Sequence, residues 1–473
     1  GGTALLERIE IDVAGLPADL TSEQLTELEA AVLAPAKRTK PKPVLLTDLQ
    51  RLNLADLHDI AESEKVELHA GRTRRDLIWE ITQSRLKARI PVLVEGVVAT
   101  QDGHHFLRSS HYDYMPSHDD VFVPPSIVQQ FGLVNGMTVV GRLRVSREAE
   151  KYLALSEIET IDRHEPEKAK TRAPFKELTP LYPEARVILE GTADNPLEMR
   201  IVDLITPVGR GQRGLIVAPP RTGKTILLQM LAKSFVEKAP DCHLIILLVD
   251  ERPEEVTDFE RMLPEGKREI ISSTFDEPAS RHLAVAEMVM HKARCLVEAG
   301  EHVVILLDSI TRLARASNVE APSNGKLLSG GMEASALQFP KKFFGAARNI
   351  EGGGSLTILA TALIETGSKM DDLIFEEFKG TGNMELRLSR QLADRRIFPA
   401  VDVNPSGTRR EEILLAPDEL KIMWKLRRVL SALDPQQGIE LLLDRLRKTR
   451  SNYEFLVQVQ QTSSIRLGDE DDK

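Results

Sequence analysis

The run Ala218–Thr225, which reads Ala-Pro-Pro-Arg-Thr-Gly-Lys-Thr, constrains the fold of this chain more than any other feature. It follows an apolar run of strand length and opens a helical pattern. A loop in that position can bind phosphate oxygens through backbone N–H groups and a helix N-terminus. Its only departure from the usual pattern is Ala218 in place of the first glycine. We therefore predict an ATP-binding α/β domain in which Lys224 contacts the β- and γ-phosphates and the Thr225 hydroxyl ligates Mg²⁺.

Further apolar runs alternate with helical patterns, which predicts a parallel sheet covered by helices on both faces. Two of the runs end in carboxylates, at the edge of the sheet where ligands of such folds bind. We predict that Asp308 is the acidic metal ligand, and that Glu251, next to Asp250, orients the attacking water. An exposed acid paired with Arg252 is the alternative for Glu251. The apolar runs are 214–218, 243–250, 269–274, 303–308 and 356–362, and the helical patterns include 225–237 and 279–298.

Residues 91–165 contain short β-type runs separated by turns rich in Gly and Asp, which predicts a small barrel. The chain is only 4 % aromatic, yet this region holds three of its five tyrosines. Such a concentration suggests a platform on which nucleic-acid bases stack, and a role of the two phenylalanines in the barrel core is an equal alternative. The runs are 91–100, 105–109, 121–123, 137–145 and 153–161, and the aromatic residues are Phe106, Tyr112, Tyr114, Phe122 and Tyr152.

Shifts in composition predict the domain boundaries. Residues 1–44 are acidic and then basic, and we expect a mobile, disordered extension, although Thr21 and Gln24 could form a capping box. The pattern of residues 45–88 predicts a small helical bundle. The predicted barrel domain is 89–165, the proline-rich linker 166–185, the ATPase domain 186–458 and the C-terminal tail 459–473, of which we expect residues 468–473 to be disordered.

The net charge of −10 argues against a protein that nucleic acid coats through bulk charge, so any nucleic-acid site must be local. The two cysteines, Cys242 and Cys295, lie far apart, which fits a reducing cytoplasm. No apolar run approaches the roughly 18 to 20 residues that span a bilayer. We expect a cytoplasmic protein without a membrane partner.

Two loops rich in Gly and Ser each contain an isolated lysine. They are 322–331, with Lys326, and 365–370, with Lys369. Flexible loops with a central cation could grip a nucleic-acid backbone and respond to the nucleotide state, whereas the alternative is that they are mobile connectors.

Long stretches of the chain resemble the family of the bacterial transcription termination factor Rho. The resemblance spans about residues 45–458 and is strongest in 207–220, 250–257, 273–282, 307–315 and 378–385. It implies a multi-domain α/β protein with a small helical bundle, a cold-shock-like OB barrel and a RecA-like P-loop ATPase domain with a mainly parallel sheet. It also implies a homohexameric ring that binds single-stranded nascent RNA and hydrolyses ATP with Mg²⁺. Such a ring translocates toward RNA polymerase as a 5′-to-3′ RNA–DNA helicase. The family also has alanine at the position of Ala218.

The resemblance also implies roles for single residues of the ATPase domain. Lys224 and Thr225 match the phosphate and metal contacts, Glu251 the catalytic glutamate and Asp308 the acidic metal ligand. Arg409 matches the arginine finger, which the family donates from one subunit to the ATP site of its neighbour. Phe398 falls where the family stacks the adenine, and the remaining candidates for nucleotide contact are Pro219, Pro220, Arg221, Thr222, Gly223 and Arg252.

For RNA, the resemblance places Lys326 and Lys369 in two pore loops. The positions that match the primary RNA site on the barrel are His104, Phe106, Arg108, Asp120, Phe122, Glu150 and Tyr152. The family's Gly-Phe-Gly-Phe motif reads Gly-His-His-Phe here, so His104 replaces one stacking aromatic residue. Arg221 stands where the family commonly has lysine, and the first 44 residues have no clear counterpart. A RecA-like ring ATPase that acts on DNA and a passive RNA-binding regulator are the alternative functions.

Overall fold

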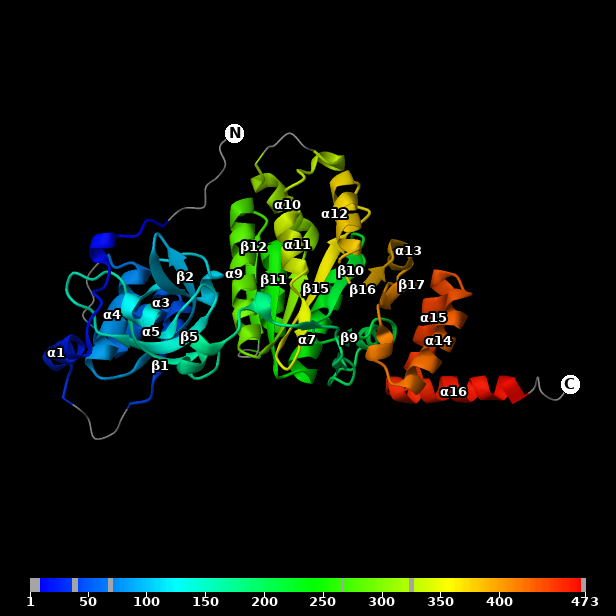
Figure 1. Cartoon of the computed structure of the whole chain (residues 1–473), viewed down its shortest axis with the longest axis horizontal. Coiled ribbons are helices and arrows are strands. Elements are labelled where there is room, and N and C mark those ends of the chain that lie inside the picture. Colours follow the sequence, from blue (N-terminus) through cyan, green and yellow to red (C-terminus); the bar gives the residue numbers. More distant parts are fainter. Residues whose placement is uncertain (1–8, 36–40, 67–70, 265–267, 323–326, 469–473) are drawn as a thin grey trace. The chain divides into compact units, whose positions relative to one another are not determined.

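The computed structural model describes residues 9–35, 41–66, 71–264, 268–322 and 327–468. Two compact units make up the chain. The N-terminal unit comprises the residues up to Glu177 together with Ala284–Ala299, and the C-terminal unit comprises Leu178–Leu283 and the residues from Gly300 onward (Figure 1). None of the helices in the described ranges is both long enough and apolar enough to cross a membrane.

The N-terminal unit is built around a small β-barrel. Its strands are ordered β1-β2-β3-β4-β6-β5, and an additional pairing of β2 with β5 closes the sheet on itself. Each of β2 to β6 begins and ends within one residue of a predicted run, so the prediction of a barrel is confirmed. The strands are β1 (Val44–Leu45), β2 (Val92–Gln101), β3 (His104–Arg108), β4 (Val121–Val123), β5 (Thr138–Arg144) and β6 (Ala154–Ile161), and α5 (Pro125–Phe131) follows β4.

The helices that precede the barrel share its hydrophobic core. Leu46, Leu57 and Leu77, from three helices, belong to the same buried cluster as Val94 and Val139 of the barrel. The predicted helical bundle therefore has no separate core and is part of the barrel unit. Its helices are α2 (Leu46–Gln50), α3 (Leu54–Ser63) and α4 (Arg74–Lys87).

The expectation of a disordered extension is wrong for residues 9–35. They contain a short 3₁₀ turn, η1 (Val13–Gly15), and the helix α1 (Ser22–Val32). The Thr21 hydroxyl oxygen accepts a hydrogen bond from the Gln24 amide, and the Gln24 side-chain oxygen accepts one from the Thr21 amide, which completes the capping box. Leu28 and Leu33 pack against the core of the unit, and this burial offsets the entropic cost of ordering the segment.

The C-terminal unit contains a mainly parallel sheet with the order β12-β11-β13-β15-β10-β16-β17 (Figure 1). Neighbouring strands are parallel from β12 to β16, and β17 is antiparallel to β16. The predicted apolar runs form five of these strands. The strands of the unit are β7 (Pro180–Leu181), β8 (Arg186–Val187), β9 (Val208–Gly209), β10 (Arg213–Ala218), β11 (Cys242–Glu251), β12 (Arg268–Thr274), β13 (His302–Asp308), β14 (Arg348–Ile350), β15 (Ser355–Leu363), β16 (Met384–Leu388) and β17 (Val401–Thr408).

Helices connect these strands and continue beyond the sheet. They are α6 (Leu197–Ile205), α7 (Lys224–Lys238), α8 (Pro253–Met262), α10 (Ile310–Glu320), α11 (Gln338–Phe344), α12 (Lys369–Lys379), α13 (Arg390–Asp394), α14 (Pro417–Ser431), α15 (Pro435–Arg447) and α16 (Asn452–Gly468). The predicted tail from residue 459 is not a separate segment, because α16 runs across that boundary. The predicted linker 166–185 contains the 3₁₀ turns η3 (Pro166–Thr171) and η4 (Phe175–Glu177) and the strand β7.

One helix belongs to both units. The long helix α9 (Ala279–Glu298) starts in the C-terminal unit, and its residues from Ala284 onward belong to the N-terminal unit. Within the N-terminal unit, Cys295 of α9 lies in the same core as the barrel strands, and Lys292 Nζ donates a hydrogen bond of 2.9 Å to the Tyr114 hydroxyl.

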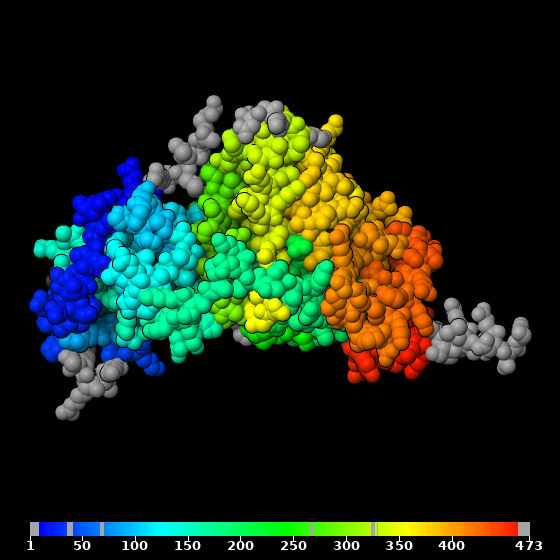
Figure 2. All heavy atoms as spheres, viewed as in Figure 1, coloured from blue at the N-terminus to red at the C-terminus, as the bar shows by residue number. Residues whose placement is uncertain are grey.

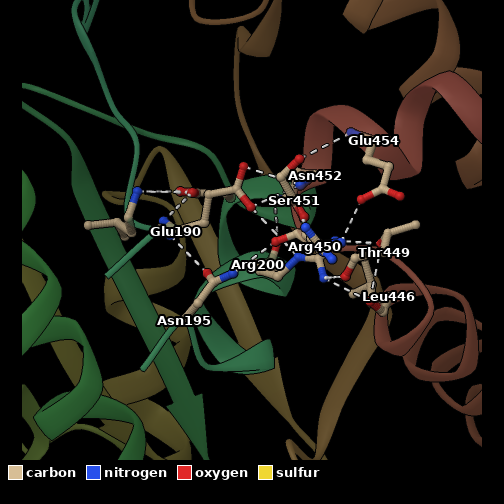
Figure 3. Close-up of polar contacts among 12 residues, drawn as sticks. Glu190, Asn195, Arg200, Leu446, Thr449, Arg450, Ser451, Asn452 and Glu454 are labelled. Carbon is tan, nitrogen blue, oxygen red and sulfur yellow. Dashed lines mark hydrogen bonds and ion pairs between the residues drawn. The ribbon is translucent and has the colours of Figure 1, made fainter. Parts of the chain in front are cut away.

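The buried side chain of Arg200 joins α6 to the end of α15 and the start of α16 (Figure 3). Arg200 is 2 % exposed, and its Nη1 donates to the carbonyls of Leu446 and Thr449, both at 2.7 Å. Its Nε donates to Asn452 Oδ1 at 3.1 Å, while the Asn452 amide donates to the Glu190 carboxylate. These contacts satisfy the carbonyls at the end of α15, which the helix itself leaves without donors.

We expect Arg200→Met to lower the free energy of unfolding by about 3 kcal/mol, because the buried carbonyls of Leu446 and Thr449 lose their donor and the Glu190 carboxylate loses the Arg200 guanidinium, whose Nε lies 3.6 Å from Glu190 Oε2. The shift of the urea-unfolding midpoint measures the effect. Arg428→Met is the control, since Arg428 is exposed on α14. Equal midpoints for the two variants would contradict this role of Arg200.

Candidate functional site

The predicted phosphate-binding loop connects β10 to α7. Gly223 has a φ of +86° and Arg221 a φ of +62°, and the Thr222 hydroxyl donates a hydrogen bond of 2.7 Å to the Pro219 carbonyl. The helix α7 begins at Lys224, so its first N–H groups have no partner within the helix. The sequence therefore folds here into an anion-binding turn.

Lys224 lies between the two predicted acids. Its Nζ is 2.6 Å from Asp308 Oδ1 and 3.2 Å from Glu251 Oε1. Burial acts to lower the pKa of Lys224, but the two carboxylates outweigh it, and the pKa is raised. Burial and repulsion from Asp308 raise the pKa of Glu251 to about 7, although Lys224 acts against that shift. Residues from three separate strand ends thus meet at one point.

One carboxylate oxygen of Asp308 is available to bind a metal ion. Its Oδ1 accepts a hydrogen bond of 2.7 Å from the Thr361 hydroxyl, while its buried Oδ2 has no hydrogen-bond partner among the described residues. A buried carboxylate oxygen costs free energy when it is left unpaired. Carboxylate and hydroxyl oxygens are the ligands that Mg²⁺ takes beside phosphates. The unpaired Asp308 oxygen and the hydroxyl of Thr225 therefore fit a Mg²⁺ ion.

Two further residues at this site were missed by sequence reasoning. Arg312 Nη1 is 2.8 Å from Asp250 Oδ2, and Arg312 Nε is 3.7 Å from Glu251 Oε1. Glu255 Oε2 accepts a hydrogen bond of 3.2 Å from the Thr225 hydroxyl. Arg312 lies four positions after Asp308, in the helix that follows its strand, and this spacing is the sequence feature that could have indicated Arg312.

The alternative pairing for Glu251 is not observed. Glu251 is 5 % exposed, and its ion-pair partners are Lys224 and Arg312. Arg252 is exposed at the N-cap of α8. Glu251 is therefore a buried acid of the loop site and not a solvated acid.

An exposed aromatic ring lies beside the phosphate-binding loop. Phe398, between α13 and β17, is 43 % exposed. Its ring atoms Cδ1 and Cε1 lie 3.8 Å from the position that a Cβ on Gly223 would occupy. An exposed ring at this distance from the loop offers a stacking surface for a planar base.

Arg409 lies at the opposite edge of the sheet. Thr408 pairs with Met384, and Met384 pairs with Gly214, so Arg409 is level with the start of β10, whereas the loop follows its end. At about 3.3 Å per residue, a strand of 6 residues separates these edges by roughly 20 Å. Arg409 therefore does not reach Lys224 of its own chain.

The surroundings of Arg409 are basic. It lines an open pocket of about 690 Å³ that Arg213 and Arg348 also line. Burial, followed by repulsion from Arg348 and Arg409, lowers the pKa of Arg213. A pocket with such mutual repulsion favours an anionic occupant.

In the N-terminal unit, Phe106, Phe122 and Tyr152 form a cluster separate from the barrel core. The Phe106 ring centroid is 5.8 Å from that of Phe122 and 5.7 Å from that of Tyr152. The His104 centroid lies 6.4 Å from that of Phe122, at an interplanar angle of 47°. The two phenylalanines therefore do not belong to the core that the barrel shares with its helices.

Two buried ion pairs contain the other predicted RNA contacts. Arg108 Nε is 3.8 Å from Asp120 Oδ2, and burial raises the pKa of Asp120 to about 7. Glu150 is held by both Nη atoms of Arg144 at 2.8 Å, a partner that sequence reasoning missed. Burial acts to raise the pKa of Glu150, but hydrogen bonds from Arg144 and from backbone amides lower it.

The two lysine-containing loops lie close together. Lys369 is exposed at the start of α12, and a Cβ on Gly330 would lie 2.7 Å from the Met370 nitrogen. Lys326 lies outside the described residues.

Comparison with known proteins identifies the family. Residues 94–167 match the Rho termination factor RNA-binding domain, and residues 198–408 match the nucleotide-binding domain of the ATP synthase alpha/beta family. The transcription termination factor Rho of Pseudomonas aeruginosa is 50% identical over 414 residues, which are 87% of this chain and 98% of that protein. The Rho of Aquifex aeolicus is 51% identical over 412 residues, 86% of this chain and 94% of that protein. The chain belongs to the Rho family of transcription termination factors.

This Rho-family chain thus joins an RNA-binding barrel to a RecA-like ATPase domain, and it is an RNA-dependent ATPase that acts in transcription termination. The alternatives of a DNA-acting ATPase and of a passive regulator do not fit this family. An ATPase of a type III secretion system from pathogenic bacteria shares the fold, with a TM-score of 0.50 and 23% identity over 60% of this chain and 86% of that one.

The expectation that the first 44 residues have no counterpart is wrong. The Rho of Rhodopirellula baltica is 48% identical over 453 residues, which cover 95% of this chain and 88% of that protein. The uncovered 5% is shorter than 44 residues, so part of the N-terminal segment has a counterpart.

Proposed function

We propose that this chain forms a homohexameric ring that binds Mg²⁺-ATP at the site of Lys224, Glu251 and Asp308 and uses hydrolysis to translocate along nascent RNA toward RNA polymerase. The observation that carries this proposal is the position of Lys224, which bridges two buried carboxylates at the carboxyl edge of the sheet. Such a lysine is already placed where the phosphates of ATP would lie.

Thr225 and Asp308 would hold the metal ion, which supplies Lewis-acid stabilisation of the phosphate charge. Lys224 neutralises the phosphate oxygens, and the amides at the start of α7 bind them. The exposed ring of Phe398 stacks on the adenine, beside Gly223.

Glu251 orients and deprotonates the attacking water. A general base works best when its pKa lies near the working pH, and the pKa of Glu251 is raised to about 7. Arg312 and Lys224 hold the carboxylate in place through their contacts with Oε1.

Arg409 acts on the nucleotide of the neighbouring subunit. Its distance from its own loop and its place in a basic pocket support a contact in trans. A head-to-tail arrangement of subunits gives such contacts and closes into a ring. Lys369, and Lys326 in the loop beyond the described residues, would hold RNA in the pore.

The ATPase rate of the full chain tests this function when it is measured without polymer, with oligo-cytidine RNA and with DNA of the same sequence. We expect RNA to raise the rate by about tenfold or more, since binding at one site changes the state of the other, and DNA to raise it less. The 2′-hydroxyl is the group that distinguishes the two polymers. An equal rate in all three conditions would contradict an RNA-driven motor.

A further inference from the structure

Residues 9–20 cover the aromatic cluster of the barrel. Ile11 and Leu16 pack directly against Phe106, Phe122 and Tyr152. The dark blue atoms of the N-terminal residues lie on the surface of the unit that contains the barrel (Figure 2). The three rings are 3 %, 4 % and 7 % exposed, so a base cannot stack on them while the segment is in place.

The same segment occupies the polar groups around the cluster. The Ala18 amide donates to Glu150 Oε1 at 3.0 Å, and the Ala18 carbonyl accepts from Arg144 Nη2 at 3.1 Å. The Asp12 amide donates to the Tyr152 hydroxyl at 3.0 Å. An adjacent donor and acceptor is the pattern that the edge of a base presents, so the Ala18 peptide uses the contacts that a base would use.

Like RNA, the segment of residues 9–20 is negatively charged. Residues 9–20 contain Glu10, Asp12 and Asp19 and no lysine or arginine. The Asp12 carboxylate pairs with Lys151, and this contact lowers the pKa of Asp12. Lys151 is next to Tyr152 and is a cation that could otherwise meet a phosphate.

We propose that residues 9–20 are an intramolecular lid that occupies the RNA site of the barrel and competes with RNA for it. The inference rests on the proposed role of the cluster of Phe106, Phe122 and Tyr152 in RNA binding. The segment and RNA then exclude each other, and the apparent affinity for RNA is the intrinsic affinity multiplied by the fraction of molecules with the lid open.

The contacts of the lid suit reversible opening. Among the described residues, the apolar side chains of Ile11 and Leu16 are partly buried on the cluster, and Val13 between them is 66 % exposed. The helix α1, which follows the lid, is held separately by Leu28 and Leu33 on the core of the unit. An opened lid therefore remains tethered beside its site, which keeps its effective concentration high.

A double variant of the full chain, Ile11→Ser with Leu16→Ser, tests the lid. We expect its Kd for oligo-cytidine, measured by fluorescence anisotropy, to fall by about tenfold. Val13→Ser is the matched control, since it removes an apolar side chain of the same segment that points to solvent, and we expect an unchanged Kd. An unchanged or higher Kd in the double variant would overturn the proposal.

Hydrogen exchange of the parent chain gives a second readout. Displacement of the lid predicts that oligo-cytidine raises the exchange rate of the Asp12 and Ala18 amides, because their partners Tyr152 and Glu150 are taken by RNA. Slower or unchanged exchange of these amides in the RNA-bound chain would mean that RNA and the segment bind together, and the lid would be refuted.

Tyr152→Ala in the double-variant background separates the two levels of the proposal. If Tyr152→Ala weakens RNA binding but Ile11→Ser with Leu16→Ser does not lower the Kd, the RNA site on the barrel is supported and the lid is refuted. If it leaves RNA binding unchanged, the proposed RNA site itself fails.

Discussion

Glu251→Gln is expected to lower the RNA-stimulated ATPase rate by about 10³-fold while nucleotide binding changes little. The amide has almost the shape of the carboxylate but cannot take a proton from water, so the loss falls on the transition state and not on the ground state. Steady-state turnover measures the first quantity, and titration of a fluorescent ATP analogue measures the second.

Glu254→Gln is the control for this variant, because Glu254 is an exposed carboxylate in the first turn of α8, shortly after Glu251 at the end of β11. The pH profile gives a further check. Since the pKa of Glu251 is raised to about 7, the parent rate should fall as the pH drops below that value and the base becomes protonated. Turnover of Glu251→Gln within a few-fold of the parent would show that another group activates the water.

Arg409→Ala is expected to lose about 10³-fold of the ATPase rate by itself, as does removal of an arginine finger elsewhere. The loss should be partly reversed when Arg409→Ala subunits are mixed with Lys224→Ala subunits. In such a ring, an interface that pairs Lys224 of one subunit with Arg409 of the next is intact. Recovery of activity as a function of the mixing ratio measures this complementation.

The neighbouring Arg410→Ala is the matched control. Arg410 pairs with Glu412 and lies 4.6 Å from the centre of the Tyr182 ring, so its charge already has partners within the chain. We expect only a small loss of activity from it. If mixed rings show no recovery at any ratio, with mixing verified, Arg409 does not act across subunits.

Patterns within short stretches of the chain explain why the strands of the sheet and the phosphate-binding loop could be predicted from the sequence. The strands that carry Glu251 and Asp308 are apolar runs buried on both faces, and the loop before Lys224 has its own residue pattern. Strand β17 was missed, since it is an edge strand that contains Asn404 and Pro405 and lacks such a pattern.

Contacts between distant residues explain what was missed. Thr361 binds Asp308 from a neighbouring strand of the sheet, 53 positions away along the chain. The fold of residues 9–20 depends on partners such as Tyr152, which is 140 positions from Asp12. The composition of this segment indicated disorder because composition does not show which distant residues the segment contacts.

The division of helix α9 between the two units has a consequence for how such a protein can be recombined. The chain passes from one unit to the other at 177/178, at 283/284 and at 299/300. A fragment that ends at Glu177 lacks Cys295, which completes its core, and Lys292, which binds Tyr114. A single crossover between two genes would therefore not transfer the N-terminal unit intact. Exchange of RNA specificity between relatives requires that residues 284–299, which include most of α9, be exchanged together with the barrel.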